Sequence, residues 1–148
     1  MQSNPIACSF FQSPTDILQF SLTTIGACHQ QLDLAMRGVE TRGFEQCLFV
    51  YPLDEWAKVE AKLRELNNYN PEHRKFLRAV LAMANEVQLD SQARLSVPPD
   101  LRDYAKIRGE VMVIGTLDKI ELWDPALYQK YVASLTESYE EIAEKVMK

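Results

Sequence analysis

Residues 86–124 read EVQLDSQARLSVPPDLRDYAKIRGEVMVIGTLDKIELWD, and this stretch decides the fold. Two short runs in which apolar residues alternate with polar ones, 87–89 and 94–97, flank a tight turn. Alternation with a period of two predicts β-strands, so the stretch begins with a strand–turn–strand unit. This order places one arginine, Arg94, directly after the turn.

Three further elements are predicted downstream of this unit. A short helical pattern follows the double proline at 98–99, where a preceding strand must end. Apolar runs then predict strands at 111–114 and 119–123, separated by a turn.

Outside this stretch, the clearest patterns are one strand and three helices. A strong strand at 47–51 precedes a helix that Asp54 is expected to cap, and Asn70 and Asp124 are expected to cap two later helices. Each helix has an apolar stripe at helical spacing. The stripes are Trp56, Val59, Leu63 and Leu66; Phe76, Leu77, Val80, Leu81 and Ala84; and Leu127, Tyr131, Leu135, Tyr139, Ile142 and Val146.

The C-terminal helix has two compatible interpretations. Its apolar stripe is typical of a helix that packs on the domain, and it also fits a helix that contacts another subunit. The opposite side is acidic, with Glu137, Glu140, Glu141 and Glu144.

A weak internal repeat links the two ends of the chain. Residues 42–51 align with 114–123 at a constant offset, 115 − 43 = 72. Both copies are predicted to run from a turn through a strand into a helix, which indicates two copies of one supersecondary unit. The matched residues include Leu48 with Ile120, Val50 with Leu122, and Tyr51 with Trp123.

Composition excludes several classes of protein. With 148 residues, 47% hydrophobic and 25% charged, the chain has the size and composition of one globular domain or two small halves. No apolar run approaches the roughly 20 residues of a membrane helix, and no Lys or Arg precedes Arg37, so a secretory signal is not expected. We therefore expect a cytoplasmic protein whose three cysteines, Cys8, Cys28 and Cys47, are reduced.

Catalytic and metal-binding patterns are missing from the sequence. His29 and His73 are the only histidines, and His29 is adjacent to Cys28. Side chains of chain neighbours rarely face each other, so Cys28 and His29 are not expected to form a catalytic pair. No nucleophile motif, phosphate loop or paired-cysteine spacing occurs, so we expect neither an enzyme nor a bound metal or cofactor. The net charge of −5 argues against non-specific nucleic-acid binding, but not against a specific binder with a few well-placed arginines.

Arg94 is the best candidate for such a contact. A strand–turn–strand unit fits the major groove of DNA, where an arginine fork donates two hydrogen bonds to guanine. The amide of Gln92 suits an adenine edge or a phosphate. The alternative is an ordinary strand-edge arginine paired with Asp90.

Several separated motifs resemble the MraZ family, whose members are bacterial regulators with two AbrB-like halves. The resemblance implies an α+β fold of two swapped-hairpin β halves, with helices between and after them. The expected division is 1–53, poorly matching over 1–40, then linking helices at 54–82, a second half at 83–126 and a C-terminal helix at 127–148. The motifs, which fall within roughly 41–132, lie at 41–43, 47–56, 76–77, 86–105 and 109–124.

The resemblance also implies a function. MraZ proteins bind short direct repeats in double-stranded DNA upstream of the cell-division and cell-wall genes, usually as repressors, and assemble as rings. They present an Asp-x-x-x-Arg turn from each half, which matches Asp90 as the turn-ordering residue and Arg94 as the DNA contact. Gln92 is the second DNA-binding candidate, and Arg102, Lys106 and Arg108 are weaker ones. The resemblance also implies a nucleoid-associated location.

The chain departs from the family at two places. Ala93 stands where the family usually has glycine, and a positive φ there would cost about 1 kcal/mol at most. The repeat offset puts the first-half arginine near Leu22, yet residues 1–36 contain no Lys or Arg. A competing function is therefore an assembly or interaction protein of the same fold with weakened or lost DNA binding.

Two explanations of the missing first-half arginine stay open. Either the first half has diverged, or its reading frame is not native and the frame is regained just before Thr41. Reading the 5′ end of the gene in the other two frames tests the second hypothesis. It is wrong if neither frame encodes a basic Asp-x-x-x-Arg segment.

Overall fold

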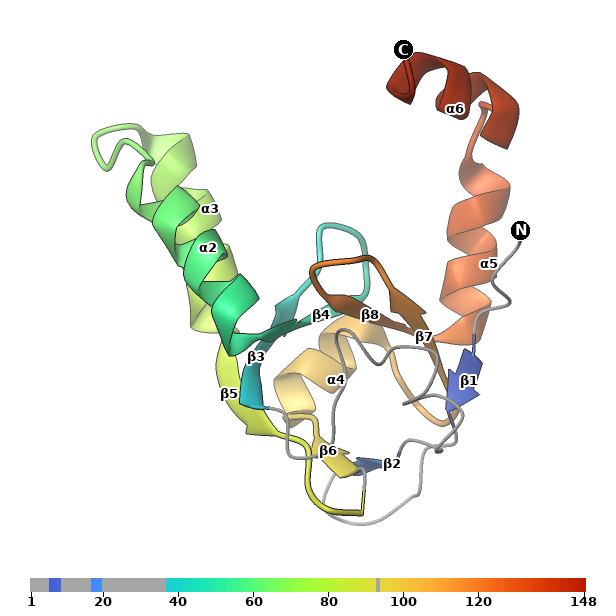
Figure 1. Ribbon diagram of the computed structural model, residues 1–148, viewed down its shortest axis with the longest axis horizontal. Helices are drawn as coiled ribbons and strands as arrows, with labels where there is room; N and C mark the ends of the chain where they lie inside the picture. Colours follow the sequence, from blue (N-terminus) through green and yellow to red (C-terminus); the bar gives the residue numbers. More distant parts are fainter. Residues whose placement is uncertain (1–5, 9–16, 20–36, 93) are drawn as a thin grey trace.

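The computed structural model describes residues 6–8, 17–19, 37–92 and 94–148 (Figure 1). The described part has a six-stranded sheet in the order β1-β7-β8-β4-β3-β5 and a second sheet of β2 and β6. The strands are β1 (Ile6–Cys8), β2 (Ile17–Gln19), β3 (Arg37–Arg42), β4 (Leu48–Pro52), β5 (Asn85–Gln88), β6 (Arg94–Ser96), β7 (Val111–Gly115) and β8 (Ile120–Trp123). The helices are α2 (Leu53–Arg64), α3 (Pro71–Ala82), α4 (Pro99–Ala105), α5 (Pro125–Ser134) and α6 (Tyr139–Val146).

The two halves of the chain exchange strands at the edges of the large sheet. β5, which belongs to the second half, pairs with β3 of the first half, and β1 of the first half pairs with β7 of the second. β4 and β8 join the halves at the centre of the sheet. This exchange confirms the α+β fold with two swapped-hairpin halves.

The two copies of the internal repeat are related by a pseudo-two-fold axis in the sheet. β4 and β8 pair antiparallel around Phe49 and Glu121, which differ by the repeat offset, 121 − 49 = 72. The two hairpins, however, differ in loop length by one residue. Glu40 lies opposite Val50, whereas Val113 lies opposite the matching Leu122, so the offset on β3 and β7 is 113 − 40 = 73. The constant offset was therefore wrong by one residue on β3.

Alternate residues of the central strands build two separate cores. Leu48 and Val50 face the first core, while Phe49 and Tyr51 face the second, because successive side chains of a strand point to opposite faces. The second core lies beneath α2 and α3, where the Thr41 hydroxyl donates to the Val80 carbonyl at 2.8 Å. The first core consists of Leu48, Val50, Leu89, Leu95, Val97, Leu101, Ala105, Ile107, Val111, Val113, Ile120 and Leu122.

Two of the three expected helix caps are confirmed. The Asn70 side chain accepts from the Glu72 amide at 2.9 Å, and Asp124 accepts from the Leu127 amide at 3.1 Å. The Asp54 cap was wrong, because α2 begins at Leu53 and Pro52 occupies the cap position without a side-chain hydrogen bond. Asp54 lies in the first turn instead, where its charge favours the helix N-terminus.

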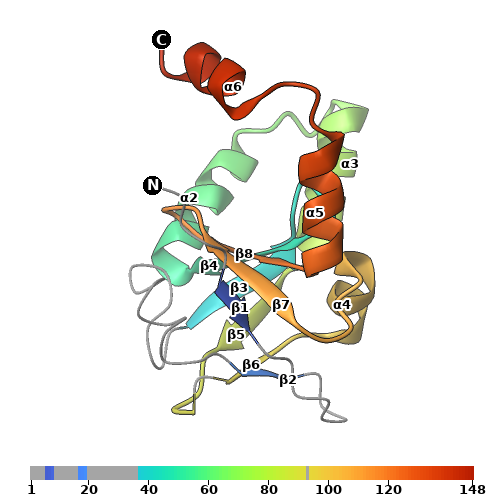
Figure 2. The ribbon, with the colours of Figure 1, turned by 90° about the vertical axis from the view of Figure 1, so that its right-hand side faces the viewer.

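The single C-terminal helix was also wrong, because the chain forms two helices there. α5 ends at Ser134, and α6 begins after Ser138, whose side chain accepts from the Glu141 amide at 3.2 Å. The Glu141 carboxylate in turn accepts from the Ser138 amide at 3.0 Å, which completes a capping box. Figure 2 shows α6 turned away from α5 and clear of the sheet.

The expected apolar stripes are covered only in part. On α2, Trp56 is buried and Val59 and Leu63 pack against it in the second core. On α3, Val80 is the buried residue, while Phe76 and Leu81 are exposed. The C-terminal stripe is covered at Tyr131 and uncovered at Leu135, Tyr139, Ile142 and Val146.

Candidate nucleic-acid interface

The turn between β5 and β6 is organised by one carboxylate. Oδ1 of Asp90 accepts from the backbone amides of Gln92 and Arg94, each at 2.9 Å. Oδ2 accepts from Nε of Arg94 at 2.8 Å, and the Asp90 amide donates to the Arg94 carbonyl at 3.1 Å. Short polar side chains favour turns because they satisfy backbone amides in this way, so the sequence of the turn explains its shape.

These contacts also set the charge state of the turn. The hydrogen bond from the Arg94 amide is the largest cause that holds the pKa of Asp90 below its ordinary value. Desolvation opposes it, and the Arg94 guanidinium and the Gln92 amide lower the pKa further. The carboxylate therefore stays ionised at neutral pH, where it binds these donors as an anion.

The turn is anchored in the first core and exposed at its tip. Leu89 and Leu95, which flank it, are both fully buried. The Arg94 side chain is 42% exposed, and its two Nη atoms donate to no residue in the part of the chain that the structure describes. The Gln92 side chain is exposed as well. Figure 1 shows the turn at the end of the molecule opposite α3 and α6.

The first half supplies no second arginine at β6 within the described residues. β2 pairs antiparallel with β6 and reads Ile17-Leu18-Gln19, with Leu18 opposite Leu95. The expected position of a first arginine, near Leu22, lies outside the described residues. So does Ala93, and its backbone strain stays a prediction.

Arg37 is a cation that sequence reasoning missed. It begins β3 and lies opposite Gln88, at the end of β5 that leads into the Asp90 turn. Its side chain is exposed. No local pattern pointed to this position, because the neighbourhood depends on a pairing between strands 51 residues apart, 88 − 37 = 51.

The weaker arginine and lysine candidates gather at the end of α4. Arg102 is half-buried, and its carbonyl accepts from the Ile107 amide at 3.1 Å. Lys106 ends the helix with a left-handed backbone, φ 56°. Arg108 forms an exposed ion pair with Asp103 at 3.1 Å. None of these three side chains belongs to the Asp90 turn.

Other chemistry finds little support in the described residues. Within them, no group of three or more His, Cys, Asp or Glu side chains could hold a metal ion, and no helix is long and apolar enough to cross a membrane. His73 accepts from the Asn67 amide through Nδ1 at 2.9 Å, which places it in the α2–α3 connection. Burial raises the pKa of the Cys47 thiol to about 12, so it is unreactive near neutral pH; Cys28 and His29 lie outside the described residues.

Comparison with known proteins gives one consistent result. A family model described as "MraZ protein, putative antitoxin-like" matches residues 29–79 and 80–148. A protein named transcriptional regulator MraZ, from Halothermothrix orenii, is 44% identical over 111 residues. That match covers 75% of this chain and 78% of the relative.

Proposed function

Because the chain belongs to the MraZ family and is a transcriptional regulator, we propose that it binds double-stranded DNA sequence-specifically through the Asp90–Arg94 turn. The operator would be a set of direct repeats upstream of the cell-division and cell-wall gene cluster, with repression as the outcome. The observation that carries the proposal is the Arg94 guanidinium, which is held at Nε by Asp90 and presents both Nη atoms at an exposed tip.

The geometry suits direct readout of a base. Arginine recognises guanine O6 and N7 through two parallel donors, and a guanidinium that is oriented beforehand loses less conformational entropy when it binds. Asp90 supplies that orientation through Nε without using the terminal nitrogens. Gln92 at the same tip, with Arg37 on the adjacent strand, would add phosphate or base contacts.

Replacing Arg94 with alanine should weaken DNA binding by about 5- to 150-fold, the effect of losing roughly 1–3 kcal/mol of readout. The measurement is a titration of labelled DNA that carries the upstream direct repeats, at two salt concentrations. Lys130→Ala is the matched control, because it removes the same unit charge from an exposed position on α5. Equal Kd values for Arg94→Ala and the wild type would exclude a role for Arg94.

Replacing Asp90 with alanine tests whether Asp90 affects DNA binding by ordering the turn or through its negative charge. The substitution removes a negative charge near DNA, which alone would strengthen binding. We expect weaker binding instead, because Arg94 and Gln92 lose the acceptor that orders the turn. Asp90→Asn keeps an acceptor for the two amides, so its DNA affinity should lie between that of the wild type and that of Asp90→Ala. Tighter binding by Asp90→Ala would show that the turn needs no such ordering.

A second candidate function is assembly without DNA binding. The net charge of −5 and the lack of a basic residue in β2 favour it. It predicts no binding of the repeat DNA by the wild type even at low salt. Under the DNA-binding proposal, low-salt binding is retained and weakens as salt rises. Each phosphate contact releases bound counterions and contributes about −0.9 to the slope of log K against log salt.

A further inference from the structure

Glu40 is a buried carboxylate that the proposed function does not use. It is fully buried on β3, and neither of its oxygens has a hydrogen-bond partner among the described residues. Cross-strand neighbours share one face of a sheet, so Glu40 points the same way as Val50, which belongs to the first core. A carboxylate in an apolar core is costly to ionise, because no donor offsets the loss of water.

The groups around Glu40 leave this cost in place. The next side chain on the same face of β3 is Arg42, but its guanidinium lies over the Tyr104 ring, 4.3 Å from the ring centroid. The Asn85 amide, opposite Glu40 on β5, donates to the Met83 carbonyl at 3.0 Å. No described charged or titratable group on the elements around this face hydrogen-bonds to Glu40. These groups are Arg42, Asp90, Arg94, Asp100, Arg102, Asp103 and Tyr104.

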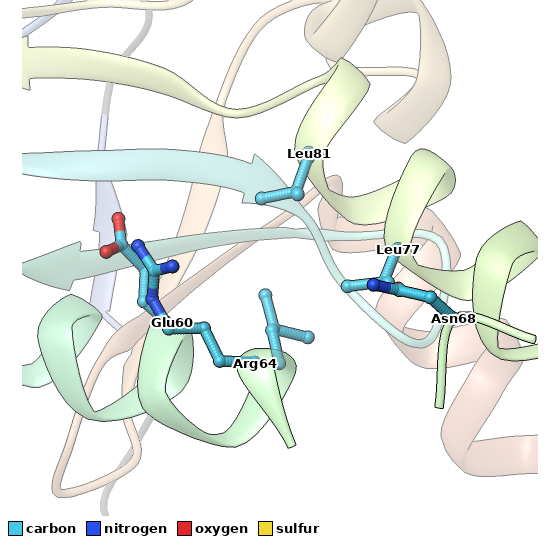
Figure 3. Close-up of a pocket in the computed structure, with 6 residues that line it drawn as sticks. Glu60, Arg64, Asn68, Leu77 and Leu81 are labelled. Atoms are coloured by element: carbon cyan, nitrogen blue, oxygen red, sulfur yellow. The ribbon is translucent and has the colours of Figure 1, made fainter. Parts of the chain in front are cut away.

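β5 is the edge strand beside Glu40, and it is weakly covered. Three of its four residues are exposed and Val87 is half-buried, whereas four of the five residues of β4 are buried. Helix α3, which precedes β5, is also open on one side. A groove of about 480 Å³ lies between α2 and α3, and Leu81 on its wall is 48% exposed (Figure 3). Segments with few buried contacts open at a lower free energy than the whole protein.

We propose that ionisation of Glu40 releases β5 from the edge of the sheet and disorders the Asp90–Arg94 turn, so that DNA binding weakens as the pH rises. β5 ends at Gln88, and Leu89, the next residue, anchors the turn in the first core. Figure 1 shows β5 leading directly into this turn. Release of β5 lets water reach the carboxylate, and it withdraws Leu89 from the core.

Proton linkage gives the sign and the size of this effect. Burial raises the pKa of Glu40 from 4.5 to about 8 while β5 is paired. Between these two values the open form binds fewer protons than the closed form, so a rising pH favours opening. The equilibrium constant for opening should increase on the order of 50-fold from pH 6 to pH 8, and about tenfold from pH 7 to pH 9.

Amide hydrogen exchange measures the opening directly. After correction for the intrinsic exchange rate, the protection of the hydrogen-bonded amides of β5 should fall on the order of 50-fold from pH 6 to pH 8. It should also be lower than the protection of β4 at each pH. Glu40→Gln should remove most of the pH dependence. Equal protection of β4 and β5 in the wild type would overturn the proposal, because Glu40 would then ionise only in the unfolded chain.

Two further variants complete the exchange measurement. Glu86→Gln is the matched control, because Glu86 is exposed on β5, and it should behave like the wild type. Glu40→Val removes the same carboxylate and introduces the residue that Val113 supplies at the pseudo-symmetric position. It provides the same test if Glu40→Gln does not fold.

Titration of the repeat DNA at pH 7 and pH 9, at one salt concentration, tests the effect on the site. The inference rests on the proposed function here, because DNA is taken to bind only the closed form. The apparent Kd of the wild type should increase by up to about tenfold, and Glu40→Gln and Glu40→Val should not show this increase. The same pH dependence in all three proteins would contradict the proposal. A wild type that binds no DNA at either pH would contradict the proposed function instead, while the exchange measurement still decides whether Glu40 releases β5.

Discussion

Replacing Glu40 with valine is expected to stabilise the protein by an amount that grows as the pH rises. Glu40 is fully buried, and neither carboxylate oxygen has a hydrogen-bond partner among the described residues. Its cross-strand neighbours are Val50 and Asn85, and the Asn85 amide donates to the Met83 carbonyl instead. Val113 occupies the pseudo-symmetric position, so a valine fits the local shape of the sheet.

The pH dependence follows from the pKa of the buried acid. Burial raises the pKa of Glu40 from 4.5 to about 8. Below pH 4.5 the group is protonated in both states, so it carries no ionisation penalty. Between pH 4.5 and 8 the unfolded chain binds fewer protons than the folded one, and the free energy of unfolding therefore falls as the pH rises. The full penalty above pH 8 is on the order of 5 kcal/mol.

Chemical denaturation at pH 5 and pH 9 measures this effect. The free energy of unfolding of the wild type should fall between these pH values. In Glu40→Val and Glu40→Gln most of this decrease should be absent. Glu86→Gln is the matched control, because Glu86 lies on the neighbouring strand β5 with an exposed side chain and should change stability by less than about 0.5 kcal/mol. A wild-type profile that is unchanged by Glu40→Gln would contradict an unpaired, buried carboxylate.

Replacing Leu122 with alanine is expected to cost about 2–5 kcal/mol of unfolding free energy, the range for large-to-small changes in a packed core. Leu122 is fully buried and lies between Leu48 on β4 and Val113 on β7. It therefore joins the two halves at the centre of the sheet, where relaxation of the backbone to fill a cavity is restricted.

Urea denaturation checks this prediction, with Leu117→Ala as the control. Leu117 has the same side chain at an 87% exposed position, so its truncation removes little buried area. Its expected effect is within about 0.5 kcal/mol. A cost below about 1 kcal/mol for Leu122→Ala would show that the junction between the halves is not tightly packed.

Local patterns were enough to predict most elements after β3. β6 and β7, the Asn70 and Asp124 caps, and the α2 stripe depend on residues close in sequence, whose periodicity and cap chemistry act within one or two turns. The spacing of Asp90 and Arg94 likewise marked the candidate site, since the side-chain hydrogen bonds that order the turn join residues two to four positions apart.

β3 and its role could not be predicted in the same way. The segment Arg37–Arg42 places an ionisable residue, Glu40, at a core position, so its strand pattern is broken. The strand forms because β4 and β5 pair with it on both sides, and these pairings override a weak local preference. Arg37 reaches the candidate site only through that pairing.

The sequence by itself therefore determined the local units: the Asp90–Arg94 turn, the Asn70 and Asp124 caps, and the repeat of β4 in β8. Only the tertiary structure decided which strands of the two halves pair, that Glu40 is buried, and that α6 lies clear of the sheet in the described part of the chain. The physical reason is the distance along the chain between the residues that interact. Turns, caps and amphipathic stripes arise from neighbours along the chain, whereas burial and strand exchange depend on contacts between distant segments that no local pattern encodes.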